Sequence, residues 1–188
     1  MARTIQQGFE ALASNLEITG LQEETVSTRQ KNVREVVEAG MQVIDAFLTG
    51  SYRRSTMIGP LKEADVDIFI VLDPKYHVNG QHWLLDTTKS VLRKTYTRTP
   101  EINPNGQAVT IVFDDFRVDV VPAFHRQGGG FLIPDSNAGR WISTDPKKHV
   151  EIWTSQNKIH GGALIPLIKM LKGWNNSRAV FRSFHLEV

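Results

Sequence analysis

The sequence predicts an α/β (α+β) fold, in which a sheet of short apolar strands is flanked by helices. Helices are expected where apolar residues recur every three to four positions, as in the first forty residues and in residues 162–174. Strands are expected where β-branched residues crowd into short runs, as in residues 66–72 and 116–124. No internal repeat or low-complexity linker separates these patterns, so we expect one mixed fold.

Length and composition narrow the class of protein. The 188 residues suffice for one domain, or for one domain and part of another. A formal net charge of +2 and a hydrophobic fraction of 40% describe a globular chain without a strong overall attraction to nucleic acid or membranes. The absence of cysteine excludes disulfides and cysteine-bound zinc. No signal-peptide core and no apolar run of about 20 residues is found, so we expect a cytoplasmic protein without membrane attachment.

Two helices are expected at the beginning of the chain. The first covers about residues 5–15, and the second covers about residues 21–40. Charged side chains of the second helix, such as Arg29, are expected to point mostly outward. Its buried stripe is expected to consist of four valines: Val26, Val33, Val36 and Val37.

A turn of small residues, Gly50-Ser51, follows a strand expected over residues 41–48 and leads into a short helix over about residues 52–57. Such a turn can point backbone N–H groups and a hydroxyl group at an anion. The turn alone is a weak signal. Its position after an apolar strand, with a pair of carboxylates at the start of the next strand, makes it a candidate phosphate cradle.

Three aspartates lie in apolar strands. Asp65 and Asp67 open the strand expected over residues 66–72, and because alternate residues of a strand share a face, their carboxylates point the same way. Asp119 lies between valines in the strand expected over residues 116–124. A charge in such a setting is unfavourable unless it is paired or bound to a metal ion.

Helices and strands are expected to continue along the chain. The expected elements are a helix over 80–97, an extended segment over 100–106, a hairpin of strands 108–113 and 116–124, and a short strand over 131–134. Thr144 is expected to cap a helix that starts near Pro146. A helix over 162–174 is expected to turn four residues inward: Leu164, Leu167, Ile168 and Leu171. Another helix is expected to begin near Ser183, and the domains are expected to divide into residues 1–140 and 141–188.

The three aspartates suggest two-metal chemistry. Converging carboxylates repel one another unless cations lie between them, and Mg²⁺ favours such oxygen ligands. Two ions can activate an attacking hydroxyl group and stabilise a leaving pyrophosphate. Asp65 and Asp67 would hold both ions, Asp119 would hold the ion nearer the attacking hydroxyl group, and Gly50-Ser51 would hold the β- and γ-phosphates.

The pattern Gly50-Ser51, thirteen residues, Asp65-Val66-Asp67 and a later Val118-Asp119-Val120 resembles the nucleotidyltransferase superfamily of DNA polymerase β type. Further segments resemble the bacterial cGAS/DncV-like nucleotidyltransferases (CD-NTases), relatives of animal cyclic GMP-AMP synthase. These segments are Gly50 to Thr56, Asp119 to Phe124, Trp141 to Pro146, Leu167 to Asn175 and Ser183 to Glu187. The resemblance covers nearly all of residues 20–188. It implies a polymerase β-like core, with a mixed twisted sheet flanked by helices, and the start of a C-terminal helical domain that is truncated here.

The resemblance also implies an activity. Such enzymes join ATP, GTP or other nucleoside triphosphates into cyclic di- or trinucleotides or linear oligonucleotides, with Mg²⁺ or Mn²⁺, in bacterial antiphage (CBASS) defence. Regulatory or effector proteins from the same operon are the implied partners, and nucleic-acid binding stays open. By motif, Lys169, Lys172 and Ser183 correspond to residues that grip the triphosphate. Lys169 and Lys172 are also three apart on one helix, so they share a face.

Three alternatives stay open. A CCA-adding or other tRNA-directed nucleotidyltransferase has the same core pattern. A nucleotide-sensing module could retain the pocket without catalysis, although all three aspartates are present. An antitoxin-like nucleotidyltransferase is usually smaller and lacks the segments Trp141 to Pro146 and Lys169 to Asn175.

Overall fold

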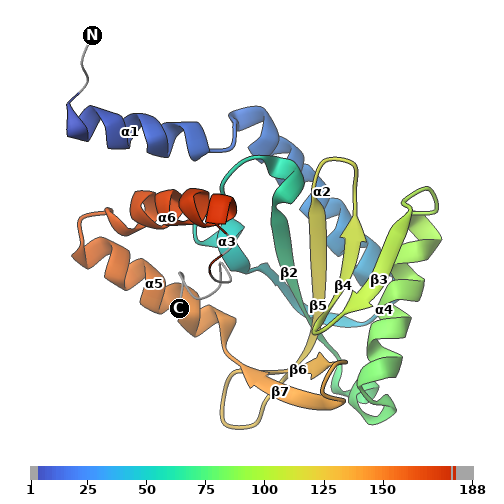
Figure 1. Cartoon of the computed structure of the whole chain (residues 1–188). Coiled ribbons are helices and arrows are strands. Elements are labelled where there is room, and N and C mark those ends of the chain that lie inside the picture. Colours follow the sequence, from blue (N-terminus) through green and yellow to red (C-terminus); the bar gives the residue numbers. More distant parts are fainter. Residues whose placement is uncertain (1–3, 179, 181–188) are drawn as a thin grey trace.

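The protein is seen in a computed structural model, which describes residues 4–178 and residue 180. A sheet lies at the centre, with helices on both sides (Figure 1). The strands are β1 (Val43–Leu48), β2 (Asp65–Leu72), β3 (Glu101–Asn105), β4 (Ala108–Val112), β5 (Arg117–His125), β6 (Phe131–Asp135) and β7 (Arg140–Thr144). The α-helices are α1 (Ile5–Leu16), α2 (Gly20–Gly40), α3 (Gly50–Arg53), α4 (Gln81–Thr95), α5 (Pro146–Ile159) and α6 (Leu164–Arg178), and the short 3₁₀ helices are η1 (Leu61–Glu63) and η2 (Pro74–Asn79).

The sheet is mixed. Its strand order is β1-β2-β5-β4-β3, and β6 pairs with β5 while β7 pairs with β6. Strands β2 and β5 are parallel, and the other pairs are antiparallel. The predicted α/β fold with a mixed sheet is therefore confirmed. Because β7 ends at Thr144, the sheet reaches slightly beyond the boundary that we expected at residue 140.

One face of the sheet is covered by α2 and α4, which contact each other. In Figure 1, α2 passes behind the strands and α4 lies at the right, beside β3. From α2, Val26, Val33 and Val37 are buried in the main core, and Val36 is partly buried against it. Alternate residues of β2 complete this core, because the strand period of two sends Val66, Ile68, Ile70 and Leu72 to the same face. These four apolar residues of β2 are thus buried against the helices, and the carboxylates of β2 lie on the other face.

That other face carries a smaller apolar cluster. Phe69 stacks on Phe47 at 5.1 Å between ring centroids and meets Phe131 edge-on at the same distance. These rings join β1, β2 and β6 and lie two residues beyond Asp67 along β2. Apolar side chains therefore lie next to Asp67 on this face of the sheet.

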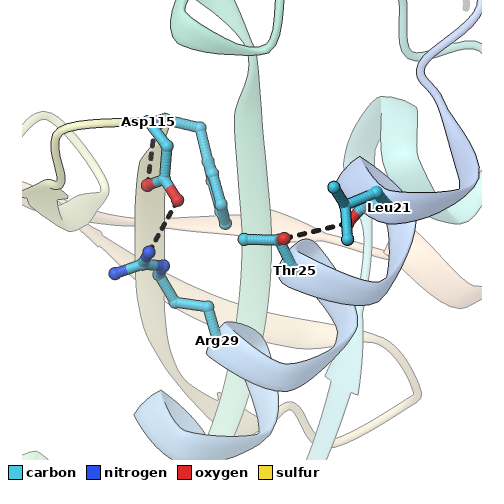
Figure 2. Close-up of polar contacts among 5 residues, drawn as sticks. Leu21, Thr25, Arg29 and Asp115 are labelled. Carbon is cyan, nitrogen blue, oxygen red and sulfur yellow. Dashed lines mark hydrogen bonds and ion pairs between the residues drawn. The ribbon is translucent and has the colours of Figure 1, made fainter.

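A long-range ion pair ties α2 to the turn between β4 and β5 (Figure 2). The Arg29 guanidinium lies 2.6 Å from the Asp115 carboxylate and 4.2 Å from the centre of the Phe113 ring. Only about 31% of the Arg29 side chain is exposed, so the expectation that it points outward is wrong. The burial of Arg29 comes from a tertiary contact, and the sequence of a helix does not show which distant turn will pack against it.

The cap of α5 also differs from the prediction. Thr144 pairs with Phe131 in β7, and the cap is Asp145, whose carboxylate accepts a hydrogen bond of 3.0 Å from the Lys148 N–H. Both residue types are good caps. The pairing of β7 with β6 decides between them, because it holds Thr144 in the sheet.

Helix α6 runs along α1 and above α3 (Figure 1). It buries Ile168, Lys172 and Asn175, whereas 45% of Leu167 is exposed, so the expectation that Leu167 faces inward is wrong. The buried face of α6 is therefore the one that carries Lys172, which donates a hydrogen bond to Thr56, and Leu167 lies outside this face. The helix expected near Ser183 lies outside the described residues. Within the described part of the chain, none of the helices combines the length and the apolar character that crossing a membrane requires.

Candidate active site

The parallel pairing of β2 with β5 brings the predicted carboxylates together. In this register Asp65 lies opposite Arg117, and Asp67 lies opposite Asp119. Opposite residues of paired strands share a face, so all four side chains project from the side that α2 and α4 leave open. The spacing of two residues within each strand keeps the set on that face. The structure thus brings together the three aspartates that the sequence predicts.

The Gly50-Ser51 turn packs directly against one of these carboxylates. Gly50 has φ +65°, in the left-handed region that favours glycine. A Cβ atom at this position would lie only 1.8 Å from Asp67 Oδ2. The Thr49 N–H also donates a hydrogen bond of 3.0 Å to the Asp67 carbonyl. Glycine is therefore required at position 50 both by the backbone and by the closeness of the carboxylate.

Helices α5 and α6 hold the turn from the other side. Thr56 N–H donates to the Ser51 carbonyl at 2.9 Å, and the Lys172 ammonium donates to the Thr56 carbonyl at 3.1 Å. The Trp153 indole N–H donates to the Arg54 carbonyl at 3.2 Å. The turn thus rests on residues that are about a hundred positions away in the sequence. Sequence reasoning missed Trp153, because a tryptophan on an amphipathic helix carries no signal of its partner.

A cleft of about 420 Å³ lies between these elements. Among the predicted site residues its lining includes Gly50, Ser51, Asp65, Asp67 and Lys172. The lining also includes residues that the sequence did not indicate, namely Glu63, Gln107 and His149. The turn, the first carboxylate pair and one lysine therefore face the same space. A lysine ammonium group in such a cleft can bind an anion such as phosphate.

The second predicted lysine lies in a different place. Lys169 lines a neighbouring cavity of about 340 Å³ together with Arg53. Its ammonium group lies 3.0 Å from the Glu17 carboxylate at the end of α1. Ser183 lies outside the described residues. Of the three residues expected to grip the triphosphate, the structure thus brings Lys172 to the cleft with the carboxylates.

Asp65 is paired with a cation from the neighbouring strand. The Arg117 guanidinium lies 2.7 Å from Asp65 Oδ1, and both side chains are about half exposed. An ion pair this exposed contributes little to stability. Asp65 can therefore exchange Arg117 for another cation without a large loss.

Asp119 lies deeper than Asp65. Burial raises the pKa of the Asp119 carboxyl, and the nearby charge of Asp65 adds to this effect. A hydrogen bond from Thr110 and the charge of Arg117 oppose the increase in pKa. Thr110 Oγ1 donates to Asp119 Oδ1 at 2.5 Å. This partly buried carboxylate is thus one whose charge a bound cation would stabilise.

The donor set suits a hard divalent cation. Carboxylate oxygens are the ligands that Mg²⁺ prefers, and this ion is usually held by one or two carboxylates, with water and phosphate oxygens in the remaining positions. In residues 4–178 and 180, no group of three or more acidic or histidine side chains is arranged so that it could hold a metal ion by itself. The aspartates instead stand side by side on adjacent strands. This open arrangement fits an ion that is shared with substrate phosphates.

Comparison with known proteins identifies the family of the chain. The model of the Second Messenger Oligonucleotide or Dinucleotide Synthetase domain (SMODS) matches residues 3–157. A cyclic AMP-AMP-AMP synthase from Acinetobacter sp. is 29% identical over 182 residues, which cover 91% of this chain and 52% of that protein. A probable cyclic nucleotide synthase from Bacillus cereus is 27% identical, over 79% of this chain and 56% of that protein. The chain therefore spans about half the length of these two curated relatives.

A solved structure shows the same fold. The CdnE cyclic dinucleotide synthase of Elizabethkingia meningoseptica, determined with GTP and Apcpp, superposes with a TM-score of 0.79 at 17% identity. The match covers 98% of this chain and 74% of that one.

Proposed function

This chain belongs to the family of Second Messenger Oligonucleotide or Dinucleotide Synthetase domains, the bacterial cGAS/DncV-like nucleotidyltransferases, and on that premise we propose that it carries a nucleotidyl-transfer centre. The reaction joins nucleoside triphosphates into a cyclic di- or trinucleotide, or a linear oligonucleotide, and releases pyrophosphate. One observation carries the proposal. The parallel pairing of β2 and β5 sets Asp67 beside Asp119, while the Gly50-Ser51 turn packs against the same carboxylate.

Each group of residues has a separate task in this proposal. The Gly50-Ser51 turn and Lys172 bind the phosphates, since they line one cleft and the lysine already donates a hydrogen bond to this region at Thr56. A lysine acts there as a point charge for phosphate. Asp119 would hold the ion nearest the attacking hydroxyl group and help to deprotonate that group. Lys169 and Ser183 are assigned to the triphosphate by the family resemblance alone.

Asp65, Asp67 and Asp119 are the residues that would hold two Mg²⁺ ions, with Mn²⁺ as a substitute. When bound, such ions lower the barrier by activating the hydroxyl group and neutralising the charge on the phosphates. The exposed ion pair of Asp65 with Arg117 supports this assignment, because it shows that a positive charge can bind to this carboxylate. On exchange, Arg117 remains on the same sheet face and becomes available to the substrate.

ATP is the first substrate to test. The Acinetobacter relative is a cyclic AMP-AMP-AMP synthase, and ATP supplies the only nucleotide of such a product. GTP and other triphosphates belong in the same assay. The expected division between residues 140 and 141 falls inside β7, so we propose instead that the catalytic core runs through Thr144 and that the C-terminal helical domain begins with α5 at Pro146.

The cellular setting follows from the family resemblance. We propose a cytoplasmic enzyme of bacterial antiphage (CBASS) defence, whose product activates an effector protein from the same operon. Regulatory proteins of that operon are the expected partners.

The test uses the full-length protein. It is incubated with mixed nucleoside triphosphates and Mg²⁺, and the products are identified by mass spectrometry. The combined substitution Asp65→Asn with Asp67→Asn should abolish product formation and leave the protein folded. Asp86→Asn, at an exposed position on α4, serves as the control. Product formation at the parental rate by the combined variant would refute the assignment of these carboxylates.

The same assay separates the proposal from the alternatives. Incorporation of nucleotides only when tRNA is added would identify a tRNA-directed enzyme instead. Nucleotide binding without any product, with all three aspartates intact, would identify a nucleotide-sensing module.

A further inference from the structure

A polar side chain that the sequence did not indicate lies next to Asp119. Strand β4 pairs with β5 in antiparallel register, so that Thr110 lies directly opposite Asp119 and shares its face. Opposite residues of an antiparallel pair have Cβ atoms about 5 Å apart, which is close enough for side chains to bond. Thr110 is a polar residue in an otherwise apolar strand. The residues on either side of it, Val109 and Ile111, are fully buried on the opposite face.

The contact between the two side chains is short and directional. Thr110 Oγ1 donates to Asp119 Oδ1 at 2.5 Å. Hydroxyl-to-carboxylate bonds of this length belong to the strong, charge-assisted class. The bond engages one carboxylate oxygen, Oδ1, and leaves Oδ2 for another partner.

Thr110 is itself oriented by a neighbour. Asn105, across the turn between β3 and β4, donates from Nδ2 to Thr110 Oγ1 at 3.5 Å. A hydroxyl group that accepts one hydrogen bond directs its own proton elsewhere, which here is toward Asp119. The β-branched side chain of threonine also restricts the rotation of its hydroxyl group about χ1. The Thr110 hydroxyl is thus held in place by its strand, by its branching and by Asn105.

We propose that Thr110 is a positioning residue for the carboxylate of Asp119. It fixes the rotation of the carboxylate so that Oδ2 is presented to a divalent cation, and it acts through Asp119 without touching the cation. This inference rests on the proposed function, in which Asp119 is a metal ligand. Groups that orient a metal ligand commonly change metal affinity or activity by about 10- to 100-fold when they are removed.

The test measures cation binding rather than activity. Mn²⁺ is titrated into the full-length protein with a non-hydrolysable ATP analogue, and free Mn²⁺ is followed by electron paramagnetic resonance. Thr110→Val keeps the shape and the β-branching but removes the hydroxyl group, and it should weaken Mn²⁺ binding about tenfold. Thr110→Ser restores a hydroxyl group and should stay within about threefold of the parent.

A matched control removes another threonine hydroxyl group. Thr154→Val on α5 deletes a hydroxyl group that donates to the Val150 carbonyl of the same helix, and it should leave Mn²⁺ binding unchanged. Unfolding curves for all variants report whether each one is folded. Parental Mn²⁺ affinity in Thr110→Val, or equal losses in Thr110→Val and Thr110→Ser, overturns the inference.

One more variant separates this inference from the proposed function. If Asp119→Asn binds Mn²⁺ as the parent does, Asp119 is not a ligand, and both proposals fail at this residue. If Asp119→Asn loses affinity while Thr110→Val keeps it, only the role of Thr110 is overturned.

Discussion

Gly50 offers a sharp test of the site geometry. Replacing it with alanine adds a single methyl group at a position where φ is +65°. A non-glycine residue in this region costs about 1–2 kcal/mol. The new Cβ would also lie 1.8 Å from Asp67 Oδ2, whereas real Cβ atoms stay at least 3.0 Å from other heavy atoms. The carboxylate and the turn must therefore move apart by roughly 1 Å or more.

Such a displacement should matter more for catalysis than for folding. A misplacement of about 1 Å in an active site can reduce the rate by about 100-fold, which corresponds to about 2.7 kcal/mol. We therefore expect Gly50→Ala to lower kcat/KM for nucleotide joining by about 100-fold or more. Its loss of stability should stay near the backbone cost of about 1–2 kcal/mol.

Gly139→Ala is the matched control. Gly139 has φ +62°, nearly the same as Gly50, but a Cβ there would meet no atom within 4 Å. The control should therefore lose a similar amount of stability and keep its activity within about twofold. The assays are chemical denaturation and initial rates of product formation in the full-length protein. Equal activities of Gly50→Ala and Gly139→Ala would refute the contact between the turn and Asp67 as an element of the site.

Two further predictions concern Asp119 and the lysines of α6. Because burial raises the pKa of the Asp119 carboxyl, its ionised form weakens the metal-free fold, so Asp119→Asn should be more stable than the parent at neutral pH in EDTA. The stability advantage of Asp119→Asn should shrink as the pH falls through the raised pKa, and it should vanish below the ordinary aspartate range. Denaturation at several pH values checks this, with Asp114→Asn, at an exposed position, as the control. An Asp119→Asn variant that is less stable than the parent at neutral pH would contradict the prediction. Lys172→Met should raise the KM for ATP about tenfold, because Lys172 lines the carboxylate cleft. Lys169→Met should have the smaller effect, because Lys169 lines the neighbouring cavity and pairs with Glu17; steady-state kinetics that show the reverse order would count against this arrangement.

The carboxylate set could be predicted because its signals are local. An aspartate within a β-branched run is unusual by itself, and the strand period of two determines which residues share its face. The register that places Asp67 opposite Asp119 needed only the correct pairing of two strands. The Gly50-Ser51 turn could be predicted for a similar reason, since it follows one strand and the carboxylate pair opens the next strand.

Contacts between distant segments could not be predicted in the same way. Lys169 and Lys172 share a helix face, yet one meets Glu17 at the end of α1 and the other meets Thr56 beyond α3. Thr110 looked like an ordinary strand residue, because its importance depends on the register of β4 against β5. Sequence periodicity predicts which face of a helix or strand a side chain occupies, but its contact partners depend on how distant segments pack in the fold.

The parallel pairing of β2 with β5 also has a consequence for how the protein forms. It joins residues about fifty positions apart, and the intervening chain must be placed before the two strands can meet. Contacts of such long range are slow to form, because the loop must close before they contribute stability. During synthesis on the ribosome, Asp65 and Asp67 emerge well before Asp119 and stay without this partner strand until β5 has been made. The three aspartates therefore come together only when the sheet itself forms.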